Sequence, residues 1–213
     1  MFSVYGVAGR LFNGPLDQMR QVSGVKTLSR VRPAAQSPPD TDPDEHSART
    51  STQQSVAAYA QAQGTAGRRQ PLTRVHEVMS RRCITVMQGT MALEAWQSLA
   101  DQGVGQAPVV DAQGVLVGML LRADLLRPEL LPGPNAHPLA WRAWLAQPVQ
   151  DLMWTPVPSV QGDADIRHVA SVLLDTTLPA IAVVDANGVV VSVVSRSDLL
   201  QAMVHDPPLD LWG

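Results

Sequence analysis

The sequence predicts an α/β (α+β) fold in which two β-α-β-β-α units pack with pseudo-twofold symmetry, preceded by a largely disordered N-terminal region. Three observations predict this fold. Residues 109–117, VVDAQGVLV, return 74 positions later as VVDANGVVV at 183–191. Each copy combines β-rich runs with stretches of helical periodicity. Most of residues 32–71 has too few apolar side chains to offset the entropy of ordering it.

The internal repeat keeps one register without gaps. Shifting the sequence by 74 positions aligns identical residues along the whole unit: Val75 with Val149, Met79 with Met153, Leu99 with Leu173, Arg122 with Arg196 and Asp124 with Asp198. A match of this length indicates a tandem duplication. The copies differ near their ends, where the first has Leu121 and the second has Ser195.

The first copy reads as strand, helix, two strands and helix. Its pattern predicts a short strand at 83–86, a helix from about Thr90 to Gln102, strands at 107–111 and 115–120, and a helix from about Ala123. The second copy repeats this order, with strands at 157–160, 180–185 and 189–195, and helices at 164–175 and from Ser197. Asp163 precedes the earlier of these helices and is its expected cap.

The loop between the two later strands of the first copy predicts a tight hairpin. Asp111 stands at its head and Gly114 at its end. A short polar side chain and a residue that tolerates positive φ are what such a turn requires.

These patterns divide the chain into five regions. They are the N-terminal segment and Pro/Ser/Gln-rich linker at 1–71, mostly disordered; repeat 1 at 72–127; a Pro-rich connector with a short helix at 128–148; repeat 2 at 149–206; and a tail at 207–213. The apolar start MFSVYGVAGRLF is either a strand docked on the main body or a frayed terminus. In the connector, Trp141 and Trp144 lie three apart on one helix face, which indicates either packing onto the body or a stacking platform.

Charge and composition exclude several classes of function. Residues 74–213 carry eight basic and fourteen acidic side chains, and so acidic a domain is a poor binder of nucleic acid. No stretch reaches eighteen uninterrupted apolar residues, so we expect a cytoplasmic protein without membrane association. One cysteine, and histidines without metal-ligand spacing, predict no metal site. No catalytic motif is present, so we expect no enzyme and no catalytic residue.

The order of motifs resembles the cystathionine-β-synthase (CBS) domain. The motifs are V-x-x-V-M at 75–79, V-x-D-L-M-x-T-P at 149–156, V-V-D-x-x-G in both copies, and the closing S-x-x-D-L at 195–199. Two such domains in tandem resemble a Bateman module, here a stand-alone one covering about residues 72–206.

This resemblance implies a regulatory sensor that requires no cofactor and binds an adenosine-containing ligand between its repeats: AMP, ADP, ATP or S-adenosylmethionine. In the second repeat, the resemblance implies that Asp198 accepts hydrogen bonds from the ribose hydroxyls and that Ser195 supports the ribose or the phosphate. Arg196 is able to face a phosphate group. It places adenine near Val157, Pro158 and Ser159. The corresponding candidates in the first repeat are Asp124 and Arg122, and Ile84 is a further ligand-binding candidate.

The two sites are expected to be unequal. Leu121 removes the hydroxyl from the first site, and Trp154 stands where relatives tend to carry a small polar residue, so it could close one cleft. The alternative is that Asp124 and Asp198 are only helix caps and that the module is a ligand-free dimerisation or scaffold unit. In that case the N-terminal segment or the PPLDLW tail would recruit the partner. Under either hypothesis we expect a homodimer and an unidentified protein partner.

Overall fold

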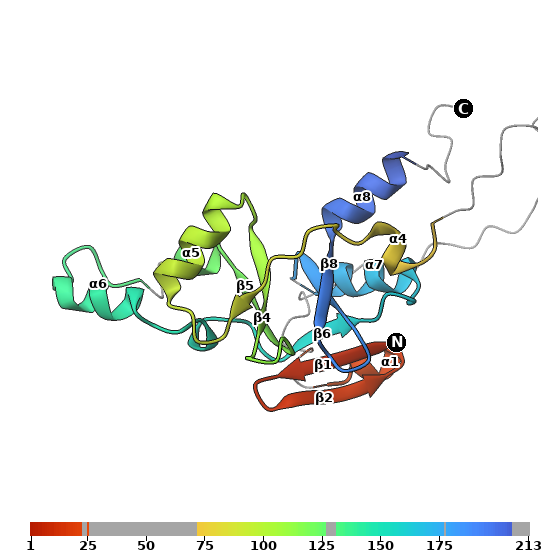
Figure 1. Cartoon of the computed structure of the whole chain (residues 1–213), viewed down its shortest axis with the longest axis horizontal. Helices are drawn as coiled ribbons and strands as arrows, with labels where there is room; N and C mark the ends of the chain where they lie inside the picture. The colour runs from red at the N-terminus through yellow and green to blue at the C-terminus, as the bar shows by residue number, and fades with distance from the viewer. Residues whose placement is uncertain (23–24, 26–71, 127–130, 177, 206–213) are drawn as a thin grey trace, which may run out of the picture. The chain divides into compact units, whose positions relative to one another are not determined.

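The computed structural model describes residues 1–22, 25, 72–126, 131–176 and 178–205. The predicted disordered linker and the C-terminal tail lie outside the described residues. The described part is the predicted mixed α/β arrangement of two repeats, each built on its own sheet (Figure 1). Among the described residues, no helix is long and apolar enough to cross a membrane.

Repeat 1 forms a three-stranded sheet. Its elements are β3 (Val86–Met87), α5 (Ala92–Asp101), β4 (Gln106–Val110), β5 (Leu116–Leu121) and the 3-10 helix η1 (Asp124–Leu126). Strand β3 pairs in parallel with β4 and α5 makes the crossover, whereas β4 and β5 form an antiparallel hairpin. The apolar face of α5 is buried through Ala92, Ala95 and Leu99, as its periodicity predicts.

Repeat 2 has the same order. Its elements are β6 (Val157–Val160), α7 (Ile166–Asp175), β7 (Ala180–Val184), β8 (Val190–Ser195) and α8 (Arg196–His205). One detail of the prediction was wrong, because the cap of α7 is Asp165 rather than Asp163. The Asp165 carboxylate accepts a hydrogen bond of 2.8 Å from the backbone N–H of Arg167, two residues on, as an N-cap does.

The same turn closes the hairpin in both repeats. The Asp111 carboxylate accepts hydrogen bonds from the backbone N–H groups of Gln113 and Val115, each at 2.9 Å, and Asp185 repeats this pattern. Gly114 and its counterpart at 188 adopt φ of +80° and +89°. Both turns therefore combine the short acceptor and the positive φ that the sequence predicts.

The N-terminus is docked as a hairpin and is not frayed. Strands β1 (Phe2–Gly6) and β2 (Gly9–Gly14) are antiparallel, and β1 also pairs with β6. The second sheet thus has five strands in the order β2-β1-β6-β7-β8. Every residue of β1 is buried, which offsets the entropy lost in ordering a chain end.

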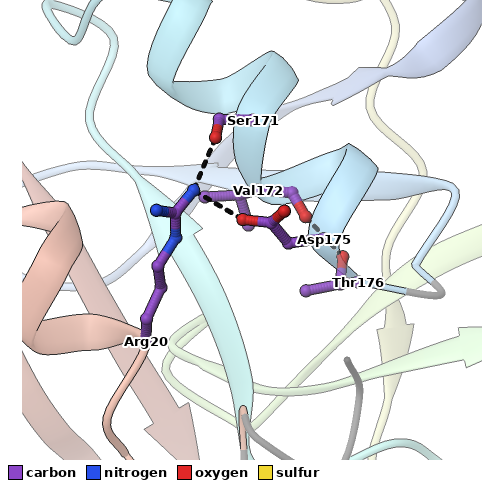
Figure 2. A network of polar contacts seen from close by, with 5 residues as sticks. All are labelled: Arg20, Ser171, Val172, Asp175 and Thr176. Carbon is purple, nitrogen blue, oxygen red and sulfur yellow. Dashed lines mark hydrogen bonds and ion pairs between the residues drawn. The ribbon is translucent and has the colours of Figure 1, made fainter. Parts of the chain in front are cut away.

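An ion pair holds the segment after the hairpin to α7 (Figure 2). Helix α1 (Leu16–Met19) follows β2, and next to it Arg20 places one guanidinium nitrogen 2.5 Å from a carboxylate oxygen of Asp175. The same nitrogen donates to the Ser171 hydroxyl at 2.5 Å. Because both charged side chains are over 40% exposed, at 41% and 48%, the pair contributes little beyond orientation.

The hydrophobic core of each repeat is completed by side chains from a segment at the start of the other repeat. We call residues 73–80 and 147–154 the leading segments; they contain helix α4 (Val75–Val78) and the 3-10 helix η2 (Val149–Asp151). Val75 belongs to the core of repeat 2, and Val149 and Met153 belong to the core of repeat 1.

The backbone hydrogen bonds of the two leading segments are related by the 74-residue shift. In the first segment, Val75 donates to Ala164, His76 to Gly162 and Ser80 to Val193; in the second, Val149 donates to Thr90, Gln150 to Gln88 and Trp154 to Met119. Adding 74 to each donor and subtracting 74 from each acceptor turns the first set into the second. The two repeats are therefore related by pseudo-twofold symmetry at the level of single hydrogen bonds.

The sheets of the two repeats share a small apolar cluster: Tyr5, Leu116, Met119, Val157, Ala182 and Val184. In the connector, helix α6 (Pro138–Leu145) packs Trp144 against the core of repeat 1. For Trp144, this packing agrees with the expectation that the connector tryptophans pack onto the body.

Candidate functional site

A cleft of about 460 Å³ lies between the first leading segment and helix α8. These two elements are in contact and lie side by side in Figure 1. The apolar part of the lining is Leu72, Val78, Met79 and Ala202, and the polar part is Glu77, Ser80, Arg81, Asp198 and Gln201. A mixed lining around this volume is typical of a site for a small organic molecule.

The carboxylate of Asp198 is the best-ordered polar group of the cleft. Its Oδ2 accepts hydrogen bonds from the Ser195 backbone N–H at 2.8 Å and from the Ser195 hydroxyl at 2.6 Å. The Asp198 backbone N–H lies 3.2 Å from that same hydroxyl oxygen. Ser195 and Asp198 thus form a capping box at the start of α8.

A third donor reaches Asp198 from the opposite repeat. The Ser80 hydroxyl, in the first leading segment, donates to the same Oδ2 at 3.1 Å. All hydrogen bonds of the Asp198 side chain that the described residues make use Oδ2, which leaves Oδ1 free to accept from a ligand. A carboxylate that is fixed by three donors and still has an open oxygen is preorganised to bind hydroxyl groups.

The charges at the cleft have opposite sign. Arg81 is exposed and lines the cleft one residue after Ser80. Glu77 accepts backbone hydrogen bonds from Arg74 and Thr73, each at 2.7 Å. These bonds favour the ionised form and lower the pKa of the Glu77 carboxyl below its ordinary value. The cleft therefore offers one cation and two carboxylates to a ligand.

Four of the residues predicted for the second site lie away from this cleft. Arg196 turns to the end of α7, where its guanidinium donates to the carbonyls of Leu173 at 2.7 Å and Thr176 at 3.0 Å. Val157, Pro158 and Ser159 are buried in β6 between β1 and β7. The Ser159 hydroxyl donates to the backbone carbonyl of Ser3. Of the predicted set, the structure brings Asp198 to the cleft, with Ser195 holding it in place.

The corresponding place in repeat 1 is built differently. Asp124 is only 8% exposed, and its carboxylate accepts a hydrogen bond from the indole N–H of Trp154. Leu121, in the position of Ser195, has no hydroxyl with which to cap the following turn. Arg122 is half-buried, and Ile84 packs against the core of repeat 1.

Sequence reasoning missed the contributions of Ser80, Arg81 and Gln201. The signal for Ser80 was present, because the 74-residue register aligns it with Trp154, the residue that stood out as unusual. No pattern in the sequence indicated that the leading segment of one repeat reaches the aspartate of the other. Within the described residues, no group of three or more potential ligands is placed to hold a metal ion.

Comparisons with known proteins agree with this architecture. The profile of the CBS domain matches residues 75–129 and 149–205, which is just over half of the chain. An uncharacterized protein of Methanopyrus kandleri is 25% identical over 127 residues, which cover 60% of this chain. A second, from Methanocaldococcus jannaschii, is 26% identical over 133 residues, or 61% of this chain. The matches span 61% and 31% of these relatives' own lengths.

Solved structures with this fold include CBS-pair proteins. The CBS-pair protein CBSX2 from Arabidopsis thaliana is 26% identical, with a TM-score of 0.54 over 62% of this chain and 94% of that one. The CBS domain pair of protein MJ0100, solved with 5-methylthioadenosine and S-adenosyl-L-methionine, is 23% identical, with a TM-score of 0.52 over 63% and 98%. The matched profile, the duplicated register and the exchanged leading segments lead to one conclusion: the chain belongs to the CBS domain family and contains a tandem CBS pair, or Bateman module.

Proposed function

We propose that this CBS pair is a non-catalytic regulatory sensor that binds an adenosine-containing ligand in the cleft at Asp198 and modulates an unidentified protein partner. The observation that carries the proposal is the open Oδ1 of a carboxylate whose Oδ2 is held by Ser195 and Ser80. Solved CBS pairs support the ligand class, since one is a complex with AMP and another with 5-methylthioadenosine and S-adenosyl-L-methionine.

The chemistry of the cleft suits such a ligand. A ribose presents two neighbouring hydroxyl donors, and a fixed carboxylate accepts from both. Apolar side chains such as Val78 and Met79 offer contact to the flat face of a base. Arg81 provides a cation for a phosphate group, and Glu77 provides an anion for the ammonium of S-adenosylmethionine.

A ligand in this cleft would act on the relation between the repeats. The lining comes from residues 72–81, which include the first leading segment, and from α8 of repeat 2. A molecule that contacts both favours arrangements in which they are close. It shifts that equilibrium only by the difference in its affinity for the alternative arrangements.

The direct test is a thermal-shift panel on the full-length protein with AMP, ADP, ATP and S-adenosylmethionine. At a hundred times its dissociation constant, a ligand adds about 2.7 kcal/mol of stability, which raises Tm by several degrees. We expect a shift that is lost in Asp198→Asn and retained in the matched control Asp124→Asn. Equal shifts in both variants would contradict the proposed site.

One observation favours a second function, that of a ligand-free scaffold. The bonds between Ser195 and Asp198 are those of a helix cap, and they account for both residues without a ligand. Under this alternative, no nucleotide raises Tm, and Asp198→Asn lowers only the basal stability, by about 1 kcal/mol. Binding of a partner through the N-terminal segment or the tail would then be independent of nucleotide.

We also propose that the protein is a homodimer. Helices α7 and α8 carry exposed apolar side chains: Leu174 on α7, and Leu200, Met203 and Val204 on α8. If a second copy of the chain packed against these side chains, their apolar surface would be removed from contact with water. Light scattering at micromolar concentration should give twice the chain mass; a monomer would contradict the proposal.

A further inference from the structure

Asp198 and Asp124 are equivalent residues of the two repeats, and each accepts a hydrogen bond from a side chain of the opposite repeat. The two donors also occupy equivalent positions, but they are different residue types. Ser80 donates its hydroxyl hydrogen to Asp198, and Trp154, 74 residues later, donates its indole hydrogen to Asp124. A hydroxyl group leaves room beside the carboxylate, whereas an indole is a flat bicyclic ring of nearly the size of a nucleobase. The same architectural position is therefore small in one site and large in the other.

The backbone of Trp154 is held in place by repeat 1. Its N–H donates to the Met119 carbonyl at 2.8 Å, and its own carbonyl accepts from the Met119 N–H at 3.0 Å. Gly118 permits this approach, because a side-chain Cβ there would lie 2.8 Å from the Trp154 carbonyl oxygen. The direction in which the indole leaves the chain is thus fixed by an antiparallel bridge.

Two other differences at the first site act in the same direction. The Asp124 carboxylate is buried, whereas Asp198 is half-buried and lines an open cleft. Leu121 provides no hydroxyl where Ser195 helps to fix Asp198. Each difference removes a group that a ligand could contact and leaves an apolar surface or a buried atom in its place.

We propose that Trp154 is a built-in occupant of the first of two symmetric ligand sites and limits the chain to one bound adenosine-type molecule. Its indole N–H takes the carboxylate acceptor that a ribose hydroxyl would take, and its ring fills the adjoining space. Trp154 therefore determines how many ligand molecules one chain binds. The identity of the ligand class rests on the proposed function, whereas the existence of a filled site does not.

Two probes separate these claims. With AMP as titrant in calorimetry on the full-length protein, we expect one site in the wild type and two in Trp154→Ala. The second probe is free indole, which should raise the Tm of Trp154→Ala by refilling the vacated site and leave the wild-type Tm unchanged. The double variant Trp154→Ala/Asp124→Asn should respond less to indole, since the acceptor for its N–H is weakened.

The outcomes distinguish the two hypotheses. If the wild type binds no AMP but indole stabilises Trp154→Ala, the filled site stands and AMP sensing fails. If the wild type binds one AMP, Trp154→Ala also binds one, and indole has no effect, the filled site is overturned.

A reverse exchange keeps the test decisive should Trp154→Ala not fold. Ser80→Trp places an indole beside Asp198 and should remove AMP binding altogether, whereas the control Arg82→Trp, at an exposed residue that does not line the cleft, should keep one site. Undiminished binding by a folded Ser80→Trp would overturn the idea that an indole at this position closes the site.

Discussion

Ser80 and Trp154 stand 74 residues apart in the sequence, and each donates a side-chain hydrogen to the aspartate of the opposite repeat, Asp198 and Asp124 respectively. A duplicated fold has thus kept the direction of one hydrogen bond while changing its donor from a hydroxyl to an indole. Since the backbone around both donors follows the same pattern of hydrogen bonds, the difference between the two sites comes from side chains.

Arg81 should determine the response to phosphate. Arg81→Ala is expected to weaken AMP binding several-fold, by about 1 kcal/mol, because an exposed charge-assisted hydrogen bond is lost. Adenosine, which has no phosphate, should bind both proteins equally. Calorimetry with both ligands checks this, and Arg82→Ala is the control, because Arg82 is exposed but does not line the cleft. Equal losses for AMP and adenosine would show that Arg81 does not contact phosphate.

Because strand β1 lies against the second hairpin turn, replacing Gly188 should lower the stability of the protein more than replacing its counterpart Gly114. Gly114→Ala forces an alanine into positive φ, at a cost of about 1–2 kcal/mol. Gly188→Ala has the same backbone cost, and its Cβ would also collide with the Tyr5 ring of β1. Urea unfolding should therefore rank Gly188→Ala as the more destabilised variant. Equal losses would mean that β1 does not pack against this turn in solution.

Glu77 should make the first leading segment sensitive to acid. Because the folded pKa of Glu77 is lowered, the stability it provides is fully present above its ordinary value of 4.5 and is lost as pH falls through the lower folded pKa. The difference in urea midpoint between the wild type and Glu77→Gln should therefore be present at pH 7 and diminish as the pH falls below 4.5. A difference that stays constant over this range would exclude titration of Glu77 as its cause.

The ion pair between Arg20 and Asp175 should be weak and dependent on salt. A double-mutant cycle with Arg20→Ala and Asp175→Ala is expected to give a coupling energy of about 0.2–1 kcal/mol, since both side chains are largely exposed. One molar salt should reduce it because the Debye length falls to about 3 Å. A coupling above about 2 kcal/mol that salt does not change would indicate a buried pair.

The sequence was sufficient for the repeat architecture because the relevant information is local and occurs twice. Alternation, helical periodicity and the turn formed by Asp111 and Gly114 each depend on neighbouring residues. Asp163 was a reasonable cap by type, yet Asp165 takes that role, since helix boundaries are less well determined by local pattern than helices themselves.

The composition of the cleft could not be predicted in the same way. Arg196 has the side chain of a phosphate ligand, but the last turn of α7 lies within its reach, and its guanidinium satisfies the carbonyls there. Val157 to Ser159 became an interior strand because the N-terminal hairpin pairs with the edge that β6 would otherwise expose. Both outcomes depend on contacts between residues far apart in the sequence.

The exchange of leading segments also has a consequence for a single repeat. Repeat 2 alone would lack Val75 in its core, and repeat 1 alone would lack Val149, because each of these side chains is carried by the other repeat's leading segment. Two copies complete each other by exchanging these segments, so one repeat is expected to be stable only with the other beside it. Because both are joined in one chain, the two halves can differ residue by residue, and one place where they do is serine at position 80 and tryptophan at position 154.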